Sequence, residues 1–177
     1  HCNSKILKLM NRRGDGSFLK ELFAKLRSRI PGLVLRTSVI TGLPGEGEEE
    51  FAELCEFLKE QRLERVGAFA FSPEEGTPAA EMTDQVPHDI STARFERLLA
   101  LQNDISLARN KRFVGRTVRV LAEEISRTDE TKITGRFDSP RPIHFTASPD
   151  VIGQFVHVKI TSADTFSLNA EMADKKI

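Results

Sequence analysis

Apolar residues in the first part of the chain recur at two different spacings. They fall every three or four positions, as on one face of a helix, in residues 4–10, 18–30, 48–62 and 88–112. Two other segments, 33–41 and 65–72, are short and rich in β-branched residues, which is typical of strands. The order helix, strand, helix, strand with short connections predicts βαβ units with a parallel sheet, so the expected fold class is α/β.

The pattern changes after residue 112. Short β-rich runs, separated by polar, Gly or Pro residues, follow one another from Val114 onward. Regularly spaced short strands of this kind predict a small antiparallel barrel. We therefore expect two domains, 1–111 and 112–177, with residues 88–112 as a long connecting helix.

Two local signals refine these boundaries. Ser4 is the expected N-cap of the first helix, because its hydroxyl can accept a bond from a free backbone N–H group. The stretch SPEEGTPAAEM, residues 72–82, is expected to be a loop because of its Pro and Gly content.

Composition and charge exclude several classes of protein. The chain has 177 residues, 39% of them apolar, and 26 basic against 26 acidic side chains. The balanced charge predicts neither a nucleic acid nor an anionic membrane as partner of the whole chain. No apolar run approaches the ~20 residues that span a bilayer, so we expect no membrane contact and a cytoplasmic location. The two cysteines, Cys2 and Cys55, fit neither a disulfide framework nor a zinc site.

The start of the sequence and its strand count indicate a fragment. His1 stands where an initiator Met is usual. Two predicted parallel strands by themselves would leave open sheet edges, which proteins normally cover. We therefore expect that earlier strands of the same sheet are missing.

One turn is a candidate for chemistry. GLPGEGE, residues 42–48, links a predicted strand to an acidic helix start, but it is neither a Walker loop nor a GxGxxG motif. Two interpretations stay open at this point. Gly42 and Gly45 are either the requirements of a tight turn, or they let backbone approach a flat ligand at the carboxyl end of the strand.

Arg36 and Thr37 interrupt an otherwise apolar predicted strand. A buried guanidinium requires an anionic partner. That partner is either a carboxylate of the same domain or the carboxylate of a ligand. The histidines His1 and His88 are uninformative alone, and the run EGEEEF indicates an exposed helix start more than a metal site, since consecutive carboxylates splay around a helix.

Four collinear stretches together resemble one enzyme family. HCNSKILKLMNRRG, LRTSVITGLPGEGEEEF, FAFSPEEGTPA and RFERLLALQNDIS are similar to the radical S-adenosylmethionine methylthiotransferases, and MNRRG with SPEEGT is most similar to the RimO type. In that family a partial TIM-type βα barrel precedes a TRAM domain, a small five-stranded OB-like barrel. The resemblance therefore implies an incomplete barrel in residues 1–111 and a TRAM domain in residues 112–177.

The resemblance also implies a role in a cofactor pocket. It places five residues of this chain around S-adenosylmethionine: His1, Arg36, Thr37, Gly42 and Ser72. The family's CxxxCxxC triad and its amino-terminal domain with a second cluster are absent from this sequence. S-adenosylmethionine and two four-iron four-sulfur clusters then belong to the parent protein, and we expect this chain to have no catalytic residue, no metal ligand, no bound cofactor and no activity alone.

The implied reaction is insertion of a methylthio group at the β-carbon of an aspartate in a small-subunit ribosomal protein. Two alternatives stay open: a tRNA adenosine methylthiotransferase of the same family, and a non-catalytic nucleic-acid-binding module. Residues 111–177 carry eleven Lys and Arg against nine Asp and Glu, a weak footprint for RNA phosphates, which favours a protein substrate but leaves RNA binding through the TRAM domain open. Arg116, Arg119 and Arg136 are the expected substrate-binding residues, against ordinary solvated barrel surface.

Overall fold

The structure, a computed structural model, describes residues 1–173 and divides into two compact units, the first His1–Ile105 and the second beginning at Ser106. The end of the predicted second domain, residues 174–177, lies outside the described residues. Across the described part, no helix is both long enough and apolar enough to cross a membrane.

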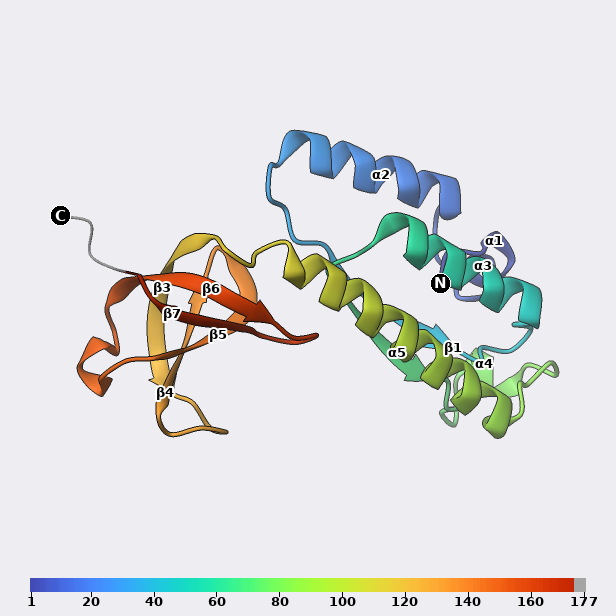
Figure 1. The fold of residues 1–177 in the computed structure, drawn as a ribbon. Helices are drawn as coiled ribbons and strands as arrows, with labels where there is room; N and C mark the ends of the chain where they lie inside the picture. The colour runs from blue at the N-terminus through green and yellow to red at the C-terminus, as the bar shows by residue number, and fades with distance from the viewer. Residues whose placement is uncertain (174–177) are drawn as a thin grey trace. The chain divides into compact units, whose positions relative to one another are not determined.

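The first unit contains a pair of parallel strands joined through a helix (Figure 1). Strands β1 (Arg36–Thr41) and β2 (Arg65–Ala70) pair in register from Arg36 opposite Arg65 to Thr41 opposite Ala70. The helices are α1 (Ser4–Leu9), α2 (Gly16–Arg29), α3 (Glu48–Gln61), α4 (Pro78–Glu81) and α5 (His88–Lys111). The α/β class and the predicted parallel pairing are therefore confirmed.

The α3 helix covers one face of this sheet because its apolar residues share one stripe. Phe51, Leu54 and Leu58 are fully buried and form one core with Val39 of β1 and Val66 of β2. Full burial of such a side chain contributes about 1.5–3 kcal/mol. Leu98 of α5 belongs to the same core.

Several predicted boundaries shift. The N-cap of α1 is Asn3 rather than Ser4, since the Asn3 side chain accepts from the N–H groups of Lys5 and Ile6. Part of the predicted loop 72–82 is the short helix α4, with Thr77 as N-cap and Pro78 in its first turn. Strand β2 ends at Ala70, so Ser72 lies beyond the strand that was predicted to contain it.

The second unit holds a closed five-stranded barrel. Its strands are β3 (Thr117–Ile125), β4 (Lys132–Phe137), β5 (Ser139–Thr146), β6 (Phe155–Ala163) and β7 (Leu168–Met172), in the spatial order β3-β4-β5-β7-β6. A 3₁₀ turn, η1 (Pro149–Val151), precedes β6. Four of the five pairings are antiparallel, and β5 with β7 is parallel, which corrects the purely antiparallel prediction.

Alternating side chains fill the barrel. On β3, Val120 and Ala122 are buried while Arg119 and Glu123 are exposed, as the two-residue period of a strand requires. The buried set is Val120, Ala122, Ile133, Ile143, Phe145, Val158, Ile160 and Leu168. The opposite side chains of the same strands therefore make the outer surface.

Candidate functional site

The turn after β1 is held by a buried carboxylate. The side chains of Glu46 and Arg94 are 0% and 7% exposed. Glu46 Oε1 accepts from the backbone N–H of Gly42 at 2.9 Å and from Arg94 Nη1 at 3.1 Å. Arg94 Nη1 also donates to the backbone carbonyl of Glu46 at 2.8 Å. Glu46 thus ties both ends of its own turn to α5.

Burial dominates the electrostatics of this carboxylate. Loss of hydration raises the pKa of Glu46 above its ordinary value, although the Gly42 N–H group and Arg94 act in the opposite direction. Two donors, the Gly42 N–H group and Arg94, hold one oxygen of this carboxyl group, Oε1.

His1 faces the other oxygen of the same carboxylate. Its Nδ1 accepts from the backbone N–H groups of Cys2 and Asn3, both at 3.1 Å. The ring proton of the neutral imidazole therefore sits on Nε2, which lies 3.4 Å from Glu46 Oε2. Both of these atoms are buried, and neither has a hydrogen-bond partner among the described residues.

Gly42 is required by packing against α5. Its φ is +74°, and a Cβ placed on it would collide with the Ser91 side chain. Ser91 Oγ in turn donates to the Thr41 carbonyl at 3.2 Å. The tight-turn interpretation of the glycine therefore has a direct structural basis, and its approach to a ligand stays a prediction.

The predicted pocket residues do not share one site. Arg36 and Thr37 are consecutive in β1, so their side chains point to opposite faces of the sheet. Arg36 is exposed, against the expectation of a buried guanidinium, and has no ion pair within residues 1–173. Ser72 is exposed as well, and the role of all three residues stays a prediction.

A cavity does bring Thr37 and His1 together. Its volume is about 360 Å³. Ser38 and Val39 of β1 line it beside Thr37, and Leu54 of α3 contributes to its apolar wall. Of the five residues predicted around the cofactor, this cavity takes only His1 and Thr37.

The cysteines do not fit an iron–sulfur cluster. Cys2 is 1% exposed, and burial raises the pKa of its thiol to about 12, whereas a cluster ligand is a thiolate. Cys55 is half-buried, and burial raises its pKa too. Over residues 1–173 no group of three or more His, Cys, Asp or Glu side chains is arranged to hold a metal ion.

The barrel gathers two of the three predicted arginines. Arg119 and Arg136 line a hollow of about 670 Å³ on the outer face of β3 and β4. Arg136 pairs with Glu123 at 3.2 Å, and the Arg119 guanidinium lies 4.0 Å from the centre of the Phe155 ring. Arg116 lies outside this hollow and packs over Phe113, at 5.6 Å from the ring centre.

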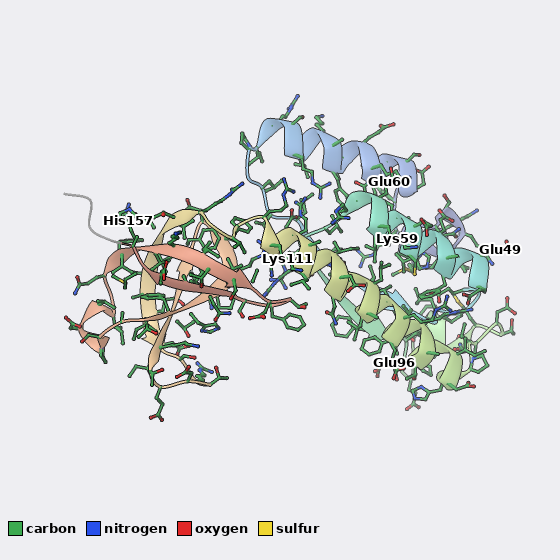
Figure 2. The ribbon with its side chains drawn as sticks, in the orientation of Figure 1. Glu49, Lys59, Glu60, Glu96, Lys111 and His157 are labelled. Atoms are coloured by element: carbon green, nitrogen blue, oxygen red, sulfur yellow. The ribbon has the colours of Figure 1, made fainter. Side chains whose placement is uncertain are left out.

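The buried polar residues Glu46, Ser91 and Arg94 were not predicted. A signal for two of them exists in α5, where Ser91, Arg94, Leu98, Gln102 and Ile105 keep helical spacing and are all buried. A helical pattern traced through apolar residues alone leaves out the polar members of this buried stripe, Ser91, Arg94 and Gln102. Glu46 belongs to an acidic run in which Glu48 and Glu49, at the start of α3 (Figure 2), are exposed as predicted, while Glu50 is partly buried.

Comparison with known proteins gives matches along nearly the whole chain. Residues 111–173 match the family model of the TRAM domain. The ribosomal protein uS12 methylthiotransferase RimO of Anaeromyxobacter sp. (strain Fw109-5) is 44% identical over 173 residues, which are 95% of this chain and 37% of the relative. That of Desulfitobacterium hafniense (strain Y51) is 44% identical over 178 residues, 97% of this chain and 40% of the relative.

A second named activity occurs among the relatives. The tRNA-2-methylthio-N(6)-dimethylallyladenosine synthase of Clostridium botulinum (strain Langeland) is 40% identical over 169 residues, 96% of this chain and 38% of the relative. The chain therefore spans about two fifths of the length of the relatives it matches. Over nearly all of its residues the chain is similar to the carboxy-terminal part of methylthiotransferases. The similarity is to the RimO type in particular, and residues 111–173 carry the match to the TRAM domain.

Proposed function

We propose that the protein containing this sequence is a radical S-adenosylmethionine methylthiotransferase that modifies an aspartate of the small-subunit ribosomal protein uS12. The observation that carries the proposal is 44% identity over 95% of the chain to a protein named for this activity. A ribosomal substrate would place the protein in the cytoplasm.

In this proposal, residues 1–111 form part of an incomplete TIM-type βα barrel and residues 112–177 form the substrate-docking TRAM domain. The open face of β1 and β2 carries Arg36 and would form a wall of the S-adenosylmethionine pocket. Support comes from the exposed, unpaired guanidinium there, which suits the ligand's carboxylate. Gly42, Ser72, His1 and Thr37 are the other proposed pocket residues, with the Thr37 side chain on the opposite face of β1 from Arg36.

The two proposed four-iron four-sulfur clusters require ligands from outside this sequence. Cys2 and Cys55 number fewer than the three thiolates of one cluster, and their burial disfavours the thiolate. We therefore expect the 177-residue chain to be inactive alone. Anaerobic reconstitution with iron and sulfide tests this: a four-iron optical spectrum that persists after Cys2→Ser and Cys55→Ser would contradict the ligand assignment.

A tRNA adenosine is the second candidate substrate, since one relative is named for that reaction. A chimera separates the two. Residues 1–177 replace the matching segment of the Anaeromyxobacter RimO, and the matching segment of the Clostridium synthase makes the control chimera. Reconstituted enzymes are given uS12 and tRNA in parallel, and products are read by mass spectrometry.

The expected result is a methylthio group on the uS12 aspartate and unmodified tRNA. If the chimera modifies neither uS12 nor tRNA while the unaltered RimO is active, the family role of this segment is contradicted. Methylthiolated adenosine with unmodified uS12 would replace the protein substrate by tRNA.

A further inference from the structure

Charge is distributed unevenly along the first unit. Residues 1–36 carry nine Lys or Arg against two Asp or Glu, whereas residues 37–105 carry five Lys or Arg against fifteen Asp or Glu. The balanced charge of the whole chain conceals this asymmetry. Eight of the nine cations lie on α1, on α2 and in the loop between them. This part of the first unit is therefore a local basic region.

Some of these cations already have partners. Lys5 and Lys20 pair with carboxylates of α3, and Arg27 donates to a backbone carbonyl at the end of that helix. Along α2 and just before it, four other cations are exposed and have no ion pair within residues 1–173: Arg12, Arg13, Lys25 and Arg29. Their charges are available to an anionic partner.

The α2 helix packs on the unit with one face only. Leu19 and Phe23 lie against the core, and the centre of the Phe23 ring is 6.1 Å from that of Phe57 in α3. No residue of α2 is fully buried, and the helix lies on the far side of α3 from α5 (Figure 1). The rest of its surface can therefore meet a partner.

A second face of α2 combines an aromatic ring with cations. Positions 18, 22, 25 and 29 are separated by four, three and four residues, so their side chains share one side of the helix. Phe18 is 53% exposed, and Lys25 and Arg29 are exposed beyond it. These positions span about 16 Å of helix.

The loop before α2 adds two cations at the Phe18 end. A Cβ placed on Gly14 would lie 2.8 Å from Cδ1 of Phe18, so the loop backbone passes directly against the ring. Arg12 and Arg13 immediately precede this glycine. We call Phe18 and its four unpaired cations, Arg12, Arg13, Lys25 and Arg29, the Phe18 face.

This composition discriminates between anionic partners. Binding of single-stranded RNA requires cations that replace the counterions of several phosphates, and an exposed ring on which a base can stack. The Phe18 face has both. A membrane surface requires a broad apolar face instead, and the neighbouring Leu22 is half-buried, which leaves Phe18 as the exposed apolar side chain on this side of α2.

We propose that the Phe18 face binds a single-stranded segment of ribosomal RNA beside the uS12 substrate, with its four cations on phosphates and one base stacked on Phe18. This inference rests on the proposed function for the choice of ribosomal RNA. It adds an RNA contact that is made by the first unit rather than by the TRAM domain.

The test is binding of the whole 177-residue chain to a fluorescent single-stranded RNA of small-subunit ribosomal sequence, by anisotropy at several salt concentrations. Lys25→Gln with Arg29→Gln removes two cations of the face. Lys59→Gln with Arg62→Gln is the matched control, because it removes the same charge from the carboxyl end of α3, where Figure 2 labels Lys59. Phe18→Leu removes the ring, Phe18→Tyr keeps it, and circular dichroism verifies that each variant is folded.

We expect the double change in α2 to weaken RNA binding about tenfold or more. It should also lower the slope of log affinity against log salt by about 1.4, since each contact to a single-strand phosphate contributes about 0.7. Phe18→Leu should weaken binding about tenfold at an unchanged slope, whereas Phe18→Tyr should bind as the unaltered chain does.

Equal losses in the two double variants, or no RNA binding by the folded chain, would overturn the Phe18 face as an RNA site. Tighter binding to tRNA than to the ribosomal sequence would overturn ribosomal RNA as the occupant. Tighter binding to phosphatidylserine vesicles would overturn nucleic acid altogether. The chimera assay uses isolated uS12 without ribosomal RNA, so it decides the proposed function separately from any of these results.

Discussion

Arg94 donates two hydrogen bonds from one nitrogen to Glu46, one to its carboxylate and one to its carbonyl. The pair joins residues 48 positions apart in the sequence. It fixes the turn that follows β1 against the first turns of α5. The other Glu46 oxygen faces His1, so three separate segments meet at one carboxylate.

Replacing Arg94 by Leu should destabilise the first unit strongly. The change leaves the Glu46 carboxylate buried without its charged partner, a loss of about 3–5 kcal/mol. Urea unfolding followed by circular dichroism measures it. Arg97→Leu is the control, because Arg97 pairs with Glu48 and both of those side chains are more than half exposed. The loss of unfolding free energy in this variant should be several times smaller than in Arg94→Leu. Equal losses would show that the Glu46 pair is not a special support of the turn.

Gly42→Ala should cost more than the backbone conformation alone explains. An Ala at positive φ costs about 1–2 kcal/mol, and at Gly42 its methyl group would also collide with Ser91. Gly76 has a φ of +78° but open space around its Cα, so Gly76→Ala isolates the conformational cost. We expect the unfolding midpoint in urea to fall clearly further for Gly42→Ala; the same shift in both variants would remove Ser91 from the explanation.

The pH dependence of barrel stability should include His144. Burial, together with the charge of Lys132, lowers the pKa of His144 below 6.5, while Asp164 acts in the opposite direction. The unfolded chain then binds the proton more readily, so this contribution is present above pH 6.5 and is lost as the pH falls through the folded-state pKa.

The difference in unfolding free energy between the unaltered chain and His144→Gln should therefore shrink on acidification. Thr134→Val is the control, since it removes the 3.0 Å contact between Thr134 Oγ1 and His144 Nδ1 but leaves the imidazole in place. A difference that stays constant from neutral to acidic pH would contradict the lowered pKa.

Asn110 should be essential to the second unit. Its side chain donates to the carbonyls of Asp164 and Thr165, at 2.7 and 3.0 Å, and accepts from Arg141 Nε. Asn110→Ala removes three partners at a position that is 1% exposed, and we expect a loss of about 2–3 kcal/mol in thermal or urea unfolding. Asn169→Ala, which removes exposed hydrogen bonds to Ser162 and Asp164, should cost much less.

The sequence was sufficient where local pattern decides the structure. The helical stripe of α3, the β-branched run of β1 and the long α5 all lie where their spacing predicts them. Strand β5 is different, because Pro140 and Pro142 lie within it and proline lacks the N–H group of a sheet ladder. Pairing with β4 on one side and β7 on the other decides the position of β5. The local sequence of β5 does not indicate this pairing.

The candidate site was predicted less well for a related reason. Glu46 and Arg94 are charged residues in segments that read as solvated, and only the tertiary packing of α5 on the turn buries them. The opposite orientations of Arg36 and Thr37 were not predicted, although the two-residue period of a strand implies them. The cavity shared by Thr37 and His1 joins segments far apart in the sequence, and it had no sequence signal.

The position of β7 between β5 and β6 sets an order on synthesis at the ribosome. Until residues 168–172 have been translated, β5 and β6 each keep one row of unpaired backbone groups, although β3, β4 and β6 can already assemble. A nascent chain stalled before Leu168, or a message with a premature stop there, would present two sticky strand edges to its neighbours. β7, the last strand among the described residues, is thus the one that protects this barrel from aggregation.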